Sequence, residues 1–191
     1  PVPFTGVPRT SRNTADMLLD QRFASTRPDV AVFTSDVLTD SVKLSGEVIA
    51  DLMVSMTGTD ADFIVKLIDV FPDDFRNPRE TAQKMGSRAV MAGYQMLVRW
   101  EVMRGKYRNS FRDPEPFVPG EKTQVKLVMP GAAHTFLPGH RIMVQVQSSC
   151  FPLIDINPQT FCNIYEADLS VFQKSDIAIW PESLLSLPVL K

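Results

Sequence analysis

Apolar and polar residues alternate with a period of two along much of this chain, which is the pattern of a β-strand with one buried face. The clearest case lies between residues 93 and 108. Apolar residues occupy every second position from Tyr94 to Val102, and three of the four positions between them are polar. We therefore predict a strand here with one dry face and one wet face.

Further strands are expected at short spacing along the chain. The segment 63–71 is apolar on both faces apart from Lys66 and Asp69, which predicts a central strand with both sides covered. The other expected strands are 30–33, 48–56, 125–129, 140–148, 163–165, 168–173, 177–180 and 184–190. No segment carries a sustained helical stripe, so the pattern predicts an all-β, two-sheet β-sandwich with long loops and little helix.

Composition supports this fold class and suggests a division of the chain. The 191 residues include fifteen prolines and nine glycines, which indicates many corners and rigid connections. Residues 1–29 are predicted to form an irregular N-terminal arm, because Pro1, Pro3 and Pro8 prevent regular structure; within it, Thr14 is expected to cap a short helical turn through Arg22. Residues 30–191 are predicted to form the sandwich domain.

Charge and hydropathy exclude some classes of partner. The net charge of −2 gives no basic surface for nucleic acid. No apolar run approaches the roughly 18 residues needed to span a bilayer, and the first residues lack the features of a signal peptide. We therefore predict neither a nucleic-acid partner nor a membrane partner.

The chain offers few groups for catalysis. The Gly-x-Ser-x-Gly turn that exposes the nucleophile of α/β-hydrolases is absent from the sequence. Ser149 and Cys150 end a predicted strand that begins near His140, and His134 is close in sequence. His140 shares its predicted face with apolar residues, however, which favours a hydrogen-bonded structural histidine. No catalytic residue is predicted.

Metal and disulfide chemistry are also not favoured. Asp60 and Asp62 lie in a segment that lacks the spacing of a calcium loop, and a hairpin turn in which carboxylates accept backbone N–H groups fits better. Cys150 and Cys162 flank a loop of eleven residues; a disulfide is one alternative, and two free thiols are favoured. No cofactor or metal is predicted.

Literal sequence strings carry further information. The longest runs from Gly93 to Gly120, and shorter ones follow one another from residue 20 onward: 20–24, 27–30, 57–63, 65–70, 72–74, 139–142, 144–149, 151–152 and 157–160. In these strings the chain resembles the C-terminal β-domain of bacterial α-amino acid ester hydrolases, glutaryl acylases, cocaine esterase and X-Pro dipeptidyl peptidases. The resemblance implies a jelly-roll, galactose-binding-like sandwich. It also implies that the Ser–Asp–His triad lies upstream, in an α/β-hydrolase domain with a helical cap.

The resemblance implies a role beside that catalytic body. This chain would be inactive alone, would brace the hydrolase domain, would wall one side of its cleft and would support homo-oligomer contacts; relatives exported by bacteria favour a periplasmic or secreted location. The candidate cleft or interdomain contacts are Phe4, Met17, Phe23, Asp73, Asp74, Cys150, Phe151, Asp155 and Asn157. Cys150 departs from the family pattern, in which an aromatic residue is common.

Two other functions remain open from the residues alone. Jelly rolls can bind carbohydrate by stacking a sugar on an exposed aromatic side chain, and Trp100, Tyr107, Tyr165 and Trp180 are the candidates. The alternating pattern around Trp100 predicts that this residue is buried. An autonomous interaction module that shares only the sandwich is the third alternative.

Overall fold

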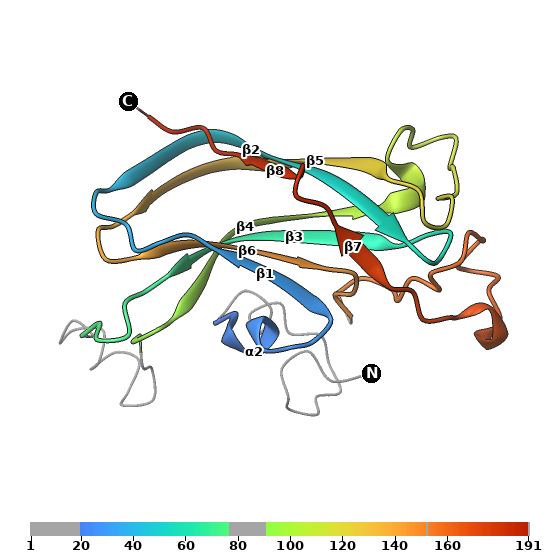
Figure 1. Cartoon of the computed structure of the whole chain (residues 1–191), viewed down its shortest axis with the longest axis horizontal. Helices are drawn as coiled ribbons and strands as arrows, with labels where there is room; N and C mark the ends of the chain where they lie inside the picture. Colours follow the sequence, from blue (N-terminus) through green and yellow to red (C-terminus); the bar gives the residue numbers. More distant parts are fainter. Residues whose placement is uncertain (1–19, 77–90, 152, 191) are drawn as a thin grey trace.

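Two antiparallel sheets stack face to face, as the computed structural model shows for residues 20–76, 91–151 and 153–190 (Figure 1). The first sheet has the order β1 (Val30–Thr34), β6 (Arg141–Gln147), β3 (Asp62–Val70) and β4 (Gln95–Arg104). The second has the order β5 (Thr123–Phe136), β2 (Val42–Met56) and β7 (Ile177–Ile179), and β8 (Leu184–Ser186) also pairs with β2. The predicted two-sheet jelly-roll sandwich is confirmed.

Helix is scarce in the described residues, as predicted. The helical elements are the single turn α2 (Arg22–Ser25) and the 3-10 turns η1 (Gly105–Tyr107) and η2 (Leu169–Val171). No helix in the described ranges has the length and apolar character needed to cross a membrane.

The main core lies between the two sheets and follows from strand alternation. On β2, Val48, Ala50, Leu52 and Val54 are buried at every second position, and they pack in one cluster with alternate residues of β3, Phe63 among them. Each large apolar side chain in such a core contributes roughly 1.5–3 kcal/mol through burial. The central position predicted for β3 is confirmed, because β3 pairs with β4 on one side and with β6 on the other.

The prediction that the apolar residues of β4 share one buried face is wrong. The register between β3 and β4 shifts between Leu67 and Ile68, so Val98 is an additional residue on β4. Val98 packs in the core between the sheets, whereas Trp100 and Val102 pack on the opposite face of the first sheet. A bulge of one residue exchanges the two faces of a strand, and a period-two pattern does not reveal it.

Other strand boundaries also differ from the predictions. β5 continues through Pro130 and Gly131 to Phe136. In the part of the chain that the structure describes, β5 pairs only with β2, and an edge strand tolerates proline. Residues 163–165 form no strand, and residues 168–173 contain the 3-10 turn η2 in place of a strand.

The outer face of the first sheet is partly covered by residues near the start of the described chain. Phe23 of α2 packs with Trp100 and Val102 around buried Ile64 and Cys150. The predicted helical turn after Thr14, and the predicted contacts Phe4 and Met17, lie outside the described residues.

Candidate functional site

One end of the sandwich carries a concentration of exposed apolar side chains. They lie on the long connection between β6 and β7, with one more on the loop after η1, at the right of Figure 1. We call this set the apolar loop end, and its members are Phe111, Phe151, Ile156, Phe161, Tyr165, Leu169 and Phe172. Tyr165 is 86% exposed, Leu169 85% and Phe111 81%. The exposed apolar side chains of these loops make this end a candidate interaction surface.

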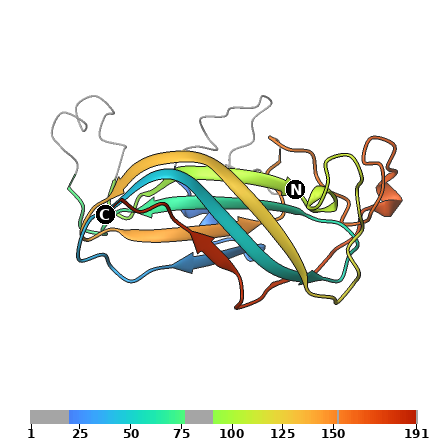
Figure 2. The ribbon, with the colours of Figure 1, turned by 90° about the horizontal axis from the view of Figure 1, so that it is seen from above.

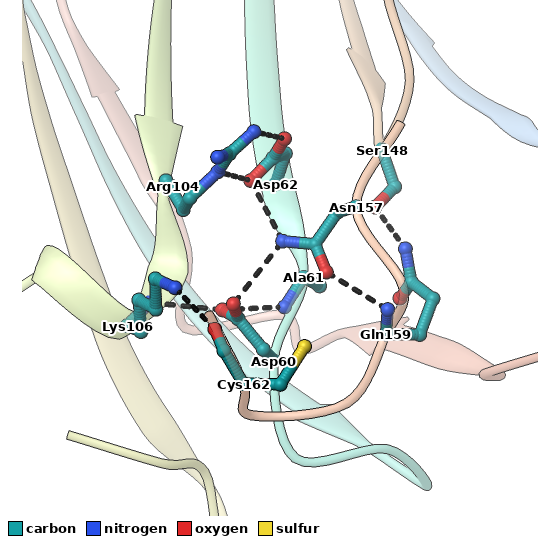
Figure 3. Close-up of polar contacts among 9 residues, drawn as sticks. All are labelled: Asp60, Ala61, Asp62, Arg104, Lys106, Ser148, Asn157, Gln159 and Cys162. Carbon is teal, nitrogen blue, oxygen red and sulfur yellow. Dashed lines mark hydrogen bonds and ion pairs between the residues drawn. The ribbon is translucent and has the colours of Figure 1, made fainter. Parts of the chain in front are cut away.

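A buried polar cluster anchors this loop to the sandwich (Figure 3). Asn157, only 3% exposed, donates from Nδ2 to Asp62 Oδ1 at 2.9 Å and to Asp60 Oδ2 at 3.2 Å. Both aspartates are buried at the start of β3. One amide from the loop therefore satisfies two carboxylates of the sheet.

Cationic and backbone donors complete the cluster. Arg104 makes a bidentate ion pair with Asp62, with N···O distances of 3.0 and 3.1 Å. Asp60 Oδ1 accepts from the backbone N–H groups of Ala61 at 2.9 Å and Lys106 at 3.0 Å. Burial raises the pKa of Asp60, while the hydrogen bond from Asn157 acts in the opposite direction. Lys106 Nζ donates to the carbonyl of Cys162 at 2.7 Å, which adds a second tie to the loop.

The same loop follows the turn between β2 and β3 closely. Asn157 Oδ1 accepts from the N–H of Gln159 at 2.8 Å, and Gln159 has a positive φ of 62°. The Gln159 carbonyl accepts from the N–H of Thr59 at 3.2 Å. Gly58 is required beside it, since a Cβ there would lie 2.4 Å from the Gln159 carbonyl oxygen. The loop is thus held in one path by several independent contacts.

The histidines considered for catalysis lie between the sheets. His140 is 4% exposed and its Nδ1 lies 2.7 Å from Asp69 Oδ1, while His134 Nε2 lies 2.9 Å from Asp69 Oδ2. Among the hydrogen bonds of the described residues, none joins either histidine to Ser148, Ser149 or Cys150. His140 is thus buried and in contact with Asp69, and its structural role stays a prediction.

Those predicted contact residues that the structure describes do not form one site. Cys150, Phe151, Asp155 and Asn157 belong to the anchored loop, although Cys150 and Asn157 are buried and Phe151 and Asp155 are exposed. Phe23 reaches Cys150 from the outer face of the first sheet.

The remaining predicted contacts and the two cysteines are placed separately. Asp73 and Asp74 are exposed in the turn after β3, at the opposite end of the sandwich in Figure 1. Cys150 and Cys162 are free thiols. Burial raises the pKa of Cys150, which disfavours its reactive thiolate.

Sequence reasoning missed several members of the site. Arg104 and Lys106 meet the aspartates only through strand pairing, and Gln159 meets Asn157 through the folding of the loop. The aromatic and aliphatic residues between 151 and 172 were the available signal, but 151–161 indicated only a structured loop, and 163–165 and 168–173 were predicted as short strands.

The aromatic candidates for sugar stacking come from separate parts of the fold. Trp100 is partly buried on the outer face of the first sheet, and Trp180 follows β7 on the second sheet, where Lys122 Nζ lies 4.0 Å from its ring centroid. Tyr107 lies on η1 and Tyr165 on the apolar loop end. Within the described ranges, no group of three or more His, Cys, Asp or Glu side chains is arranged to hold a metal ion.

Comparisons with known proteins agree with this geometry. Residues 8–173 match the family model of the X-Pro dipeptidyl-peptidase C-terminal non-catalytic domain. A cocaine esterase from Rhodococcus sp. (strain MB1 Bresler) is 37% identical over 160 residues, which cover 84% of this chain and 25% of the esterase.

Solved structures give the same result. An α-amino acid ester hydrolase superposes with a TM-score of 0.83 and 40% identity over 93% of this chain and 28% of that one. An aminopeptidase from the marine sediment archaeon Thaumarchaeota archaeon has a TM-score of 0.83 and 36% identity over 92% of this chain and 28% of its own. The chain thus spans about a quarter of the length of these relatives, and it belongs to the family of X-Pro dipeptidyl-peptidase C-terminal non-catalytic domains, which occur in larger multidomain hydrolases.

Proposed function

We propose that this chain braces the α/β-hydrolase domain of a serine hydrolase and walls one side of its active-site cleft through the apolar loop end. The catalytic triad and cap would be supplied by that upstream part of the same polypeptide. The implied reaction is hydrolysis of ester, amide or dipeptidyl bonds through an acyl-enzyme. This chain supplies no nucleophile for that reaction. It supplies a contact surface for the hydrolase domain and helps to shape the active-site cleft.

The observation that carries the proposal is the pairing of a fixed loop with an exposed apolar surface. A loop that only connected β6 to β7 would not need Asn157, Asp60 and Asp62 buried beneath it, because burying charged groups is costly unless they are paired. Exposed side chains such as Tyr165 and Leu169 gain stability only when another surface covers them. A rigid support with an uncovered apolar surface fits a docking role.

The test uses the full-length hydrolase polypeptide that contains this chain. Leu169→Asp and Tyr165→Asp place charge on the apolar loop end, and Val128→Asp is the control, because Val128 is 47% exposed on the edge strand β5. We expect kcat/KM for aminoacyl p-nitroanilides or p-nitrophenyl esters to fall by about tenfold or more in the two loop variants, which corresponds to about 1.4 kcal/mol. The control should retain activity.

A companion measurement examines the 191-residue chain by itself. We expect no turnover of p-nitrophenyl esters by this chain. Turnover that Ser149→Ala abolishes would contradict the assignment of a non-catalytic role. Unchanged activity in both loop variants of the full-length polypeptide would contradict the docking role.

A further inference from the structure

Two open sheet edges face each other on one side of the sandwich. Among the described residues, β1 pairs only with β6, and β7 and β8 pair only with β2. On the other side β4 packs against β5. Figure 2 shows β1 and β7 together on the side away from β4 and β5. As far as the described ranges go, the sandwich is therefore closed by packing along one side and open along the other.

An apolar groove lies between these open edges. Its volume is about 510 Å³, and its floor is formed by inward-facing residues of both sheets, such as Val65 and Val144 from the first sheet and Leu52 from the second. Phe33 of β1 and Leu184 of β8 stand at its mouth, 50% and 66% exposed. The groove thus extends inward as far as core residues such as Val65 and Leu52, which are themselves buried.

A second, more polar cavity continues the groove toward the first residues of β1. It has a volume of about 730 Å³ and shares Phe33, Val146 and Ile179 with the apolar groove. Ser148, Lys174 and Asp176 add polar groups to its lining. The two cavities together follow β1 along its length, because residues 30, 31 and 33 line one or both of them.

The main chain of β1 presents hydrogen-bonding groups to this open side. Ser35 N–H donates to the Ile142 carbonyl at 2.9 Å, and β1 and β6 are antiparallel with Val32 opposite Gln145. Hydrogen-bonded pairs recur at every second residue, so Phe33 and Ala31 also face β6. The N–H and C=O groups of Val32 and Thr34 consequently point away from β6, toward the open edge.

Nothing in the sequence of β1 protects this edge. Proteins usually block an exposed edge with charges, proline or a bulge. The strand Val30–Thr34 reads Val-Ala-Val-Phe-Thr, and its pairing with β6 has no register shift. An unprotected edge beside an apolar groove is the arrangement that binds extended peptides by strand addition.

We propose that an extended peptide segment supplied by another polypeptide adds to β1 as a strand and inserts alternate apolar side chains into the groove. Its main chain pairs with Val32 and Thr34, and its apolar residues contact Phe33, Ile179 and Leu184. A segment of about five residues matches β1, since a strand advances about 3.3 Å per residue. The segment is uncharged along the apolar groove, and charged residues are accepted only beyond it. This binding needs no hydrolase domain, so it stands independently of the proposed function.

The probe is an acetylated and amidated peptide of sequence Lys-Thr-Val-Thr-Val-Thr-Val-Lys with a fluorescent label, titrated with the 191-residue chain and followed by fluorescence anisotropy. Val32→Pro removes the outward N–H of β1, and it is tolerated because proline is accepted at edge positions whose N–H faces solvent. Val32→Ala is the matched control, because it trims the same side chain and keeps the N–H. Circular dichroism confirms that both variants fold.

We expect Val32→Pro to weaken binding by about tenfold or more, and Val32→Ala to bind within about threefold of the unaltered chain. A peptide with its central threonine N-methylated should also bind at least about tenfold more weakly. In an antiparallel pair with the valines in the groove, the threonines lie opposite Val32 and Thr34 and their N–H groups face β1. This result is decisive if Val32→Pro does not fold. Equal binding by Val32→Pro and Val32→Ala, or no binding at millimolar peptide, overturns the proposal. Self-association that Val32→Pro abolishes, without peptide binding, would instead assign the edge to a second copy of this chain.

Discussion

His140 and Asp69 form a buried contact in the space between the two sheets, with 2.7 Å between Nδ1 and Oδ1. His134 contacts the other oxygen of the same carboxylate from β5, so Asp69 joins the first sheet to the second. The ring of Phe71 packs on His140, with 4.6 Å between centroids, and helps to fix the imidazole in place. Polar groups so well buried stabilise a fold only while each has its partner.

Removal of either imidazole tests this link. The side chain of His140 is 5% exposed and that of His134 is 19% exposed, so water replaces the lost partner of Asp69 more easily at His134. We expect His140→Ala to lower the free energy of unfolding by roughly 2–4 kcal/mol and His134→Ala by roughly half of that. Urea denaturation monitored by fluorescence measures both values. Equal losses would show that burial does not govern the contact.

Lys66 gives the chain a specific dependence of stability on pH. Burial lowers the pKa of Lys66 from 10.5 to about 8, and its Nζ donates to Gln21 Oε1 at 2.9 Å. Between pH 8 and 10.5 the unfolded chain holds this proton and the folded chain does not. The free energy of unfolding contributed by Lys66 therefore rises with pH across that window, by roughly 3 kcal/mol in total.

The variant Lys66→Met separates this effect from other titrations. Methionine has a similar shape and no charge, so the rise in stability above pH 8 should disappear. Denaturant unfolding at intervals from pH 7 to pH 10 measures the slope for both proteins. A slope that is the same in Lys66→Met and in the unaltered chain would mean that Lys66 keeps its ordinary pKa in the fold.

Local pattern was sufficient to predict much of the fold, because β-branched alternation and burial act on neighbouring residues. The strand β3 was recognised since seven of residues 63–71 are apolar. The two charged residues of that segment, Lys66 and Asp69, have buried hydrogen-bond partners. The faces of β4 were predicted wrongly because one additional residue, Val98, reverses the alternation. The alternation of apolar and polar residues does not show where along a strand such a bulge lies.

The candidate site was less predictable because its members come from distant segments. The turn role of Asp60 follows from its immediate neighbours, and its carboxylate accepts the N–H of Ala61 as such turns require. The pair of Asp62 with Arg104 depends on the register of β3 against β4, and the approach of Asn157 depends on the path of a long loop. Neither of these two contacts can be predicted from the spacing of residues along the chain.

Asn157 is expected to control the order of the loop that carries the apolar loop end. Asn157→Ala removes one donor from each of Asp60 and Asp62 and the acceptor for Gln159 N–H. We expect a loss of roughly 1–3 kcal/mol in the free energy of unfolding. Amide hydrogen exchange across residues 148–176 should also accelerate. Asn109→Ala is the control, because Asn109 is exposed and its side chain bonds only to Glu115 Oε2 among the described residues. If amide exchange in Asn157→Ala were as slow as in the unaltered chain, the other contacts of the loop would be sufficient to hold it in place.

Gly58 provides the last test, because it permits the close approach of the loop to the turn between β2 and β3. A Cβ at Gly58 would lie 2.4 Å from the Gln159 carbonyl oxygen, and the loop backbone would have to move. At Gly131 the nearest atom to a Cβ would lie 3.8 Å away, which is an ordinary contact. We expect Gly58→Ala to cost roughly 1–3 kcal/mol and Gly131→Ala to stay within about 0.5 kcal/mol of the unaltered chain. Thermal unfolding of the two variants compares them directly. If Gly58→Ala were as stable as Gly131→Ala, the loop would not be held against that turn, and the rigid support inferred for the apolar loop end would lose one of its ties.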